Sequence, residues 1–427
     1  MTGQTSALQA LMHLLKSYIG SGILAMPKAF SYSGIIIGCI GTPVIGLLCH
    51  TCIHMLIDIN EYLCQKLSLQ PMDYEELAEK VFENGPDRLQ KFSKAFRIVV
   101  TSFLFVAQMG FCTTYYVFIA SNIKQFSESV STNGWSCVSI EYYLLIVLPF
   151  LVLISFIKNI KHLSIASMFG NVLQLVSFVI IIYNLVSQMD NISDTVLVSD
   201  KVPQFFSTTM FTYEGITVTM GLYRSMKNRR NFDKPCGVIN NAIAIVIVFY
   251  VTVGLLGYLK YGDQVAGSIT LSLPKKPIYE SVQLMYSIAI FISYPIQLYV
   301  AINILWPLIY TKLHERKVSS CIIDVCNYGF RTCLVLLTYA LAALIPKLDL
   351  ILSLIGAISC STVAIMIPPI LHTMIFYELK KETLSRLWLC IRNAFIFLFG
   401  LLGFCIGTYF SLKDIIESID ISDVDNC

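Results

Sequence analysis

The sequence predicts an all-α polytopic membrane protein, and three observations carry that prediction. Of the 427 residues, 56% are hydrophobic and only 13% are charged, which excludes an ordinary soluble globular protein. Apolar stretches of about 20 residues, the length of a bilayer-spanning helix, recur along the whole chain. The alternating pattern of about 10 residues that marks a transmembrane β-strand is not present. We therefore expect a helical chain whose main environment is the lipid bilayer.

Eleven transmembrane helices are expected, with an error of several residues at each end. They cover residues 9–31, 34–57, 96–123, 141–157, 162–187, 203–225, 236–259, 277–310, 331–346, 348–371 and 388–411. The pattern also allows one span fewer or one more. The first span is too long for a cleavable signal and lacks a basic leader, so we expect it to remain in the membrane.

The loops differ in positive charge, and this predicts an orientation. With a cytosolic N-terminus, the inner loops hold 21 Lys and Arg residues and the outer segments hold 8. Cytosolic loops carry the excess of positive charge in membrane proteins. We therefore expect a cytosolic N-terminus and an external or lumenal C-terminus. A plasma membrane and a lysosomal or endosomal membrane both remain open.

The sequence lacks the motifs that mark several other kinds of function. The 14 cysteines lie mostly in apolar segments, and the pairs Cys49/Cys52 and Cys321/Cys326 have no second pair at zinc-finger spacing. No phosphate-binding loop, zinc-protease motif or catalytic triad is visible in the loops, and no filter-like loop suggests a channel. We expect no enzyme activity, no resident cofactor or metal, and no nucleic-acid partner.

The first span is interrupted near its middle by Gly20, Ser21 and Gly22, and Pro27 follows. Glycine costs about 1 kcal/mol relative to alanine inside a helix. Irregular backbone at membrane depth persists only where protein or a water-filled cavity satisfies the freed groups. The break therefore indicates a ligand site, although a kinked packing helix would show the same pattern.

The sixth span has a second interruption, at Thr212, Tyr213, Glu214 and Gly215. A carboxylate at mid-membrane costs about 2.5 kcal/mol or more, so it indicates a functional role by default. The alternative is a structural glutamate that caps loose backbone amides, and the two roles are compatible.

The positions of the two breaks, five spans apart, predict an inverted repeat with the ligand site between the halves. We expect one domain over 1–427, with repeats at 9–187 and 203–371 and an extra helix at 388–411. The positive ends of broken helices suit a carboxylate, so a small zwitterion or anion is expected. The carboxylate is assigned to the backbone of the first break with Ser17 or Ser21, and the ammonium to residues 212–215. Phe211 and Tyr213 are candidates for the side-chain pocket.

Two loops are more than connectors. Residues 72–94 predict a charged amphipathic helix on the cytosolic face, either a solvated linker or a surface for a cytosolic partner. The outer loop 188–202 holds the N-x-S/T acceptor at Asn191, although a short loop near the membrane is a poor glycosylation site.

Several motifs resemble one family. They are His13–Lys16 with Gly20–Pro27, Phe211–Ile216 with Met226–Asn228, Gln108–Cys112, and Gln297–Val300. Together they resemble the proton-coupled amino acid transporter (PAT) branch of the amino acid/auxin permease (AAAP) family, over essentially the whole chain. The resemblance implies a 5+5 inverted repeat of the leucine-transporter (APC) type with helices 1 and 6 broken. It also implies symport of small neutral amino acids with protons as the coupling ion, with His13 in proton coupling.

The chain also departs from that family. Asn303 stands where an acidic residue is common, and the loop between spans 7 and 8 has no cysteine, so Cys137 has only Cys427 as an evident external partner. These departures leave two alternatives open. One is a proton-independent amino acid uniporter or exchanger, and the other is a transporter-like amino acid sensor (transceptor).

Overall fold

The computed structural model describes residues 6–130, 138–158, 160–187, 195–226, 232, 234–235, 237–380 and 382–424. Every named element in these ranges is a helix. Eight helical stretches in the described ranges have the length and apolar composition to cross a membrane, and the helix at Ile140–Ser155 is apolar but shorter. The prediction of an all-helical polytopic membrane protein is confirmed.

The first of these stretches, Ala7–Leu67, contains the first two expected spans. It consists of α1 (Ala7–Tyr18), the short 3₁₀ helix η1 (Gly22–Ala25) and α2 (Met26–Leu67). Within α2 the backbone turns at Gly34, which has a φ of 78°, so the predicted boundary between spans 1 and 2 is confirmed. A Cβ at Gly34 would lie 2.7 Å from the Leu197 carbonyl oxygen, so this turn needs glycine both for its φ and for its space.

The other helices follow the expected spans, several of them with longer ends. They are α5 (Ser93–Val130), α6 (Ile140–Ser155), α7 (Ile160–Ser187), α8 (Val202–Tyr213), α9 (Ile216–Ser225), α11 (Val238–Tyr261), α12 (Pro277–Glu315), α13 (Ser320–Leu344), α14 (Leu348–Ile355), α15 (Ile367–Leu379) and α16 (Thr383–Val424). Short 3₁₀ helices lie at Gly262–Gln264 (η3) and Ile269–Ser272 (η4). The sixth span is thus two helices, α8 and α9.

The tenth span contains a stretch of π-helix between α14 and α15. The two π segments are η5 (Gly356–Cys360) and η6 (Thr362–Met366). A Cβ at Gly356 would lie 1.8 Å from the Ser207 carbonyl oxygen, so glycine is required where this span touches α8. π-Helical turns are rare and occur often at functional sites.

The chain forms two compact units, each assembled from separate parts of the sequence. The first comprises Met1–Leu104, Thr195–Leu255 and Ser353–Cys427, and the second comprises Phe105–Asp194 and Leu256–Leu352. Each unit draws on both predicted repeats: the first two spans of each repeat lie in the first unit, and the third and fourth spans lie mainly in the second. The repeat relationship itself stays a prediction.

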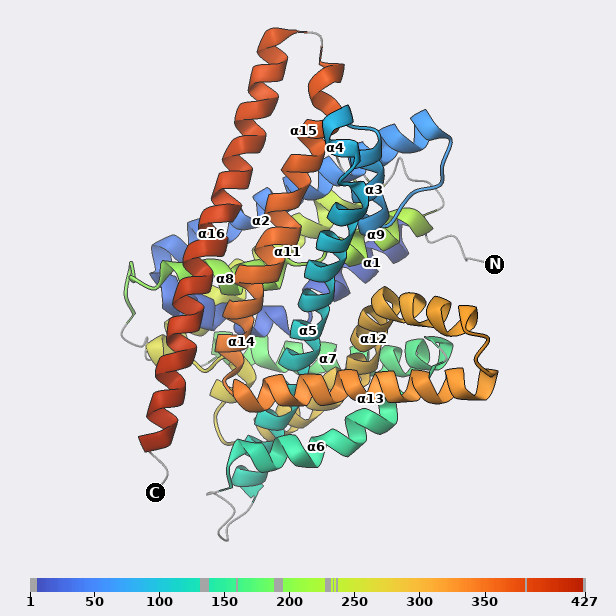
Figure 1. Ribbon diagram of the computed structural model, residues 1–427. Coiled ribbons are helices and arrows are strands. Elements are labelled where there is room, and N and C mark those ends of the chain that lie inside the picture. The colour runs from blue at the N-terminus through green and yellow to red at the C-terminus, as the bar shows by residue number, and fades with distance from the viewer. Residues whose placement is uncertain are drawn as a thin grey trace. The chain divides into compact units, whose positions relative to one another are not determined.

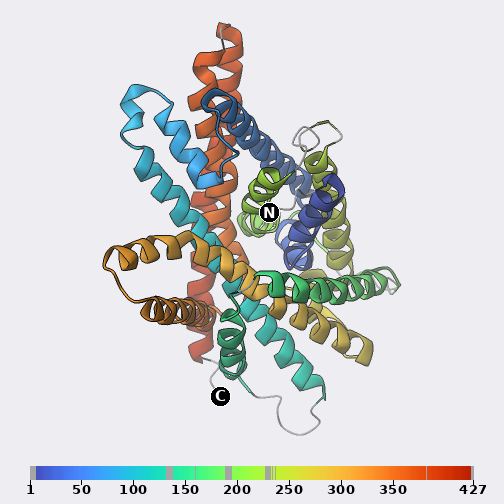
Figure 2. The same cartoon turned by 90° about the vertical axis from the view of Figure 1, so that its right-hand side faces the viewer.

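In the first unit, α2 packs against α8 and α15, and α16 runs alongside α15 (Figures 1 and 2). The amides of Ile35 and Ile36 donate to the carbonyls of Val196 and Leu197, at 3.2 and 3.0 Å. These bonds tie the turn at Gly34 to the segment that leads into α8. The α8 helix is consequently held between α2, α16 and the π-helical stretch.

The predicted helix in 72–94 is present as α3 (Tyr74–Glu83), followed by the one-turn α4 (Asp87–Gln90). Its apolar face is buried against α2 and α15, and Tyr74 donates a hydrogen bond of 2.9 Å to the Val363 carbonyl in η6. Asp73, which precedes α3, forms an ion pair with Arg224 at the end of α9. Burial raises the pKa of Glu75 in this helix. The helix is therefore part of the packed unit and not only a solvated linker.

In the second unit, α12 packs on α7, and α12 and α13 form a hairpin that also contacts α6 (Figure 1). Buried Arg331 of α13 donates 2.7 Å and 2.9 Å hydrogen bonds to the Ser155 carbonyl and the Asn327 side chain. It therefore satisfies a carbonyl at the end of α6, where a helix leaves such groups unpaired.

Candidate functional site

The first break lies where the sequence places it. The α1 helix ends at Tyr18, residues 19–21 form a turn, and η1 begins at Gly22 and leads directly into α2. The first amides of a helix and the last carbonyls of the preceding one have no partner within their own helix. The break therefore offers donors on one side and acceptors on the other.

The second break is shorter. The α8 helix ends at Tyr213, Glu214 has an extended backbone with φ −69° and ψ 116°, and α9 begins at Ile216. Both breaks belong to the first unit. The two predicted interruptions of spans 1 and 6 are thus confirmed as breaks in the helices.

The two breaks touch each other at two points. A Cβ at Gly22 would lie 3.2 Å from Cα and Cβ of Thr212, tighter than most real contacts. A Cβ at Gly215 would lie 2.6 Å from two ring carbons of Tyr18. Each break therefore contributes a glycine on which a residue of the other break packs; a Cβ at Gly215 would overlap Tyr18, and one at Gly22 would require Thr212 to shift by a few tenths of an ångström.

A tyrosine of α11 joins the two breaks. The hydroxyl of buried Tyr250 lies 2.6 Å from the Tyr18 carbonyl oxygen and 2.8 Å from that of Thr212. These two carbonyls stand near the ends of α1 and α8, where intrahelical donors run out. One hydroxyl hydrogen is shared between two acceptors, so each carbonyl is only partly satisfied and keeps capacity to bind another donor.

Glu214 lies between α8 and α9, and its part in a ligand site stays a prediction. Its carboxylate lies near the amide of Ile216, in the first turn of α9, which is where a structural cap would lie. The carboxylate oxygen Oε1 is buried and has no hydrogen-bond partner in the described residues. An unpartnered buried oxygen is costly in a folded protein and marks a place for a missing donor.

Gly20 of the first break is less tightly packed than Gly22. Among the described residues, a Cβ at Gly20 would meet only backbone oxygens of its own turn, at 3.5 Å and beyond, which is ordinary contact distance. Ser17 and Ser21 are half-buried, and Ser21 does not cap η1 with its side chain. A Cβ therefore fits at Gly20 among the described residues, whereas Gly22 lies against Thr212.

The aromatic candidates have different surroundings. Tyr213 is buried with its hydroxyl against Gly46 of α2, and its ring centroid lies 4.9 Å from that of Tyr250. Phe211 is buried, and its backbone nitrogen faces Gly356 of the π-helical stretch. Both shape the packing around the second break. Their contact with a ligand stays a prediction.

His13 lies apart from the junction. Its side chain is exposed on α1, as is that of Lys16 one turn later. Its role in proton coupling therefore stays a prediction, and it does not touch the breaks in this structure.

Sequence reasoning missed several residues that the structure brings together. Tyr18 and Tyr250 were not singled out, although both contact the breaks. His50 and His54, one turn apart on α2, have Nε2 atoms 3.0 Å apart, and His54 also lies 2.9 Å from Asn240 Oδ1. Their spacing of four residues places both rings on one face of a helix, and this spacing is the sequence signal that could have identified the pair.

Two motifs quoted from the sequence meet inside the second unit. Gln297 of α12 donates a 2.6 Å hydrogen bond to Gln108 of α5.

Three other predicted positions, namely Asn191, Cys137 and Cys427, lie outside the described residues.

Comparison with known proteins gives the family. Residues 3–413 match the model of the transmembrane amino acid transporter protein family. The chain is 32% identical to the proton-coupled amino acid transporter-like protein pathetic of Drosophila melanogaster, over 96% of this chain and 85% of that protein. It is 27% identical to vacuolar amino acid transporter 3 of Schizosaccharomyces pombe, over 95% of this chain but only 58% of the yeast protein.

Solved structures of similar fold have low sequence identity. MhsT in complex with L-phenylalanine aligns with a TM-score of 0.48 and 12% identity, over 95% of this chain and 99% of that one. A mutant of the Eremococcus coleocola manganese transporter aligns with a TM-score of 0.49 and 10% identity, over 98% and 94%. The match that covers nearly the whole chain decides the identity: the protein belongs to the transmembrane amino acid transporter family (AAAP) and is a multi-pass amino acid transporter, not an enzyme.

Proposed function

We propose that this transporter carries small neutral amino acids together with protons, by alternating access, and that the substrate binds at the junction of the two broken helices. One observation carries the proposal: the breaks in spans 1 and 6 meet, with Gly22 on Thr212 and Tyr18 on Gly215. Broken helices that meet near the middle of the membrane are where secondary transporters bind substrate.

The chemistry of the junction suits an α-amino acid. The helix that begins at Gly22 presents the positive end of its dipole, which favours a carboxylate, and Gly20 leaves space for close approach. The unpartnered Glu214 Oε1 and the half-satisfied carbonyls of Tyr18 and Thr212 are acceptors for an ammonium group. The same donors and acceptors would satisfy both charges of a zwitterion.

The walls of the junction favour a small, uncharged side chain. Phe211 and Met26 are buried there, and the Thr212 hydroxyl lies 3.6 Å from the Met26 sulfur. Apolar walls reward an apolar side chain and penalise a charged one, because burying a charge without a partner is costly. The tight packing at Gly22 and Gly215 limits the room for a large side chain.

Two groups are candidates to carry the coupling proton. The exposed His13 has the family's position, and histidine changes charge near neutral pH. Glu214 lies at the junction itself, and its Oε1 has no hydrogen-bond partner among the residues that the structure describes. A proton would neutralise this buried carboxylate while the carbonyls of Tyr18 and Thr212 accept from the substrate ammonium, so proton and substrate can be bound at the same time, as symport requires.

The charge asymmetry of the loops supports a cytosolic N-terminus. One relative is named a vacuolar transporter, which supports an acidic organelle as a location alongside the plasma membrane. Epitope tags at the two ends, tested for antibody access in intact cells and intact organelles, check the orientation. Equal access to both tags contradicts it.

Reconstitution tests the function. The purified protein in proteoliposomes, with pH 5.5 outside and 7.5 inside, should accumulate labelled alanine or glycine above equilibrium, and should do so less without the pH gradient. Accumulation should be accompanied by internal acidification.

The alternatives give different results. An exchanger or uniporter would equilibrate the label without acidification, and a sensor would bind amino acid without flux. The acidic face of α3 would then be the surface available to a cytosolic partner. Labelled lysine or glutamate taken up in preference to alanine contradicts the neutral specificity.

A further inference from the structure

The α9 helix (Ile216–Ser225) leads from the two breaks toward the surface of the first unit. It begins directly after Glu214 and Gly215, and Gly215 lies against the Tyr18 ring at the end of α1. The charge asymmetry of the loops favours the cytosolic side for its other end. Because Glu214 and Gly215 are not helical, α9 can turn relative to α8 without unwinding either helix.

An ion pair fastens the far end of α9. Arg224, in its last turn, pairs through Nη1 with the Asp73 carboxylate. Asp73 is the N-cap residue of α3, yet its side chain accepts no hydrogen bond from the amides of that helix. An N-cap aspartate usually accepts from such an amide, so Asp73 holds Arg224 in place of capping α3.

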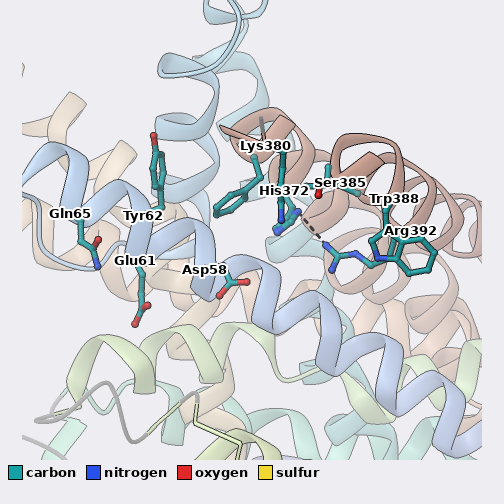
Figure 3. A pocket seen from close by; sticks show the side chains of 11 residues that line it. Asp58, Glu61, Tyr62, Gln65, His372, Lys380, Ser385, Trp388 and Arg392 are labelled. Carbon is teal, nitrogen blue, oxygen red and sulfur yellow. Dashed lines mark hydrogen bonds between the residues drawn. The ribbon is translucent and has the colours of Figure 1, made fainter. Parts of the chain in front are cut away.

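A hydrogen bond from the neighbouring residue fastens the same end. The hydroxyl of buried Tyr223 donates to Glu61 Oε1 of α2 at 3.1 Å. In Figure 3 the Glu61 carboxylate points away from His372 of α15. The centroid of the Tyr223 ring also lies 5.6 Å from that of buried Phe232. Tyr223 and Arg224 thus make two separate links from one turn of α9.

Both acceptors are held by α2. Buried Asn60, next to Glu61 on α2, donates from Nδ2 to the Met72 carbonyl at 2.9 Å and accepts at Oδ1 from the Met72 amide at 3.2 Å. These two bonds fix the residue before Asp73 to α2. Asp73 and Glu61 are therefore held in place together, whereas both donors belong to α9.

The ion pair is suited to repeated opening. The side chains of Arg224 and Asp73 are 54% and 44% exposed, and an ion pair in water contributes little free energy. Separating the two charges leaves both of them hydrated, so neither becomes a buried charge without a partner. The position of α9 against α2 therefore depends on a weak and reversible contact at its end.

We propose that the Arg224–Asp73 and Tyr223–Glu61 links form a latch, and that the latch opens when an amino acid leaves the junction toward the cytosol. With the latch closed, α9 stays beside α2 and against Tyr18. With the latch open, α9 turns about the second break and separates from Tyr18. The proposal rests on the proposed substrate site at the junction.

Hydrogen–deuterium exchange of the purified full-length protein tests whether the ion pair holds α9. Amide exchange within residues 216–225 should rise about two- to fivefold in Asp73→Asn and in Arg224→Gln, as the loss of an exposed ion pair implies. The double variant should exchange no faster than either single variant, because both changes remove the same link. Unchanged exchange in the single variants, or additive effects in the double variant, overturns the proposal.

Two further variants sharpen the exchange measurement. Arg97→Gln breaks the ion pair of Arg97 with Glu79 of α3, so it is the matched control and should exchange like the wild type within residues 216–225. Tyr223→Phe should raise the exchange on its own, and adding it to Arg224→Gln should raise the exchange further, because it removes the other link. No change in Tyr223→Phe overturns the two-link arrangement.

A reducible cross-link tests whether the latch must open. Asp73→Cys/Arg224→Cys, joined by a bis-maleimide with a disulfide spacer, should lose at least roughly tenfold in uptake of labelled alanine into proteoliposomes once mass spectrometry shows the cross-link. Reduction of the spacer should restore uptake. Each single cysteine variant, treated in the same way, controls for the native cysteines and should keep its uptake. Full uptake by the cross-linked protein overturns the proposal.

The two measurements separate the latch from the proposed function. If the wild type carries no alanine, the proposed substrate is wrong, whereas the exchange of residues 216–225 still decides whether Arg224 and Asp73 hold α9. If the wild type carries alanine and the cross-linked protein does so equally, the latch is wrong and the substrate stands.

Discussion

The hydroxyl of Tyr250 lies 2.6 Å from the carbonyl oxygen of Tyr18, a residue 232 positions earlier in the chain. The same hydroxyl lies 2.8 Å from the Thr212 carbonyl, so one side chain of α11 holds the ends of both broken helices. The Tyr250 hydroxyl thus links the end of α1 to the end of α8.

Tyr250→Phe should leave both carbonyls without this donor. An unsatisfied buried acceptor costs about 1–3 kcal/mol, so transport should fall by roughly tenfold and the thermal midpoint should drop. Tyr258→Phe on the same helix, whose hydroxyl contacts Asp263, is the matched control for uptake. Equal uptake by the two variants would show that the Tyr250 hydroxyl does not support the junction.

Gly215→Ala should abolish most uptake. The added Cβ would lie 2.6 Å from the Tyr18 ring, so either Tyr18 or the second break must move. Gly221 lies on the same short helix, α9, and a Cβ there meets no atom of the described residues within 4 Å. Gly221→Ala should therefore transport like the wild type. The account fails at this point if both variants show the same uptake per molecule of folded protein in proteoliposomes.

His13→Ala and Glu214→Gln separate the two proton candidates. If Glu214 couples the proton, Glu214→Gln should bind substrate weakly and show no acidification, whereas His13→Ala should retain acidification. If His13 couples the proton, His13→Ala should show no acidification, whereas Glu214→Gln should retain it. Substrate-driven acidification is measured in the same liposomes as uptake. Acidification at the wild-type level in both variants would contradict both assignments.

Tyr74→Phe should destabilise the first unit. It removes the donor to the Val363 carbonyl in the π-helical stretch, which costs about 1 kcal/mol or somewhat more for a buried acceptor. Thermal unfolding followed by tryptophan fluorescence measures the loss. Tyr409→Phe, on the exposed side of α16, is the control. An unchanged midpoint in Tyr74→Phe would mean that α3 does not support η6.

Much of the fold follows from local properties of the sequence. Apolar stretches of sufficient length predicted the spans, and the glycines at 20, 22 and 215 marked both breaks before any contact was known. The turn at Gly34 was also predictable, since the apolar pattern pauses there. These features depend on residues that are close in sequence.

The remaining features of the site depend on distant residues. Tyr18 and Tyr250 are ordinary aromatic residues in apolar helices, and only packing shows that they meet at the breaks. The amphipathic pattern of α3 predicted a helix on the membrane surface. The same pattern arises when the apolar face packs against protein, so the sequence alone does not distinguish the two. A pocket lined by Asp58 of α2, His372 of α15 and Arg392 of α16 (Figure 3) joins residues more than 300 positions apart, which no local pattern records.

Equilibrium binding of labelled alanine to purified variants tests the central claim most directly. A Cβ fits at Gly20 among the described residues, so the side chain of Gly20→Val should occupy the space of the substrate carboxylate without disturbing Thr212. The account predicts binding at least roughly tenfold weaker for Gly20→Val, with an unchanged thermal midpoint, and wild-type affinity for the control Gly221→Val. Wild-type affinity in a folded Gly20→Val variant would contradict the claim that substrate binds at this junction.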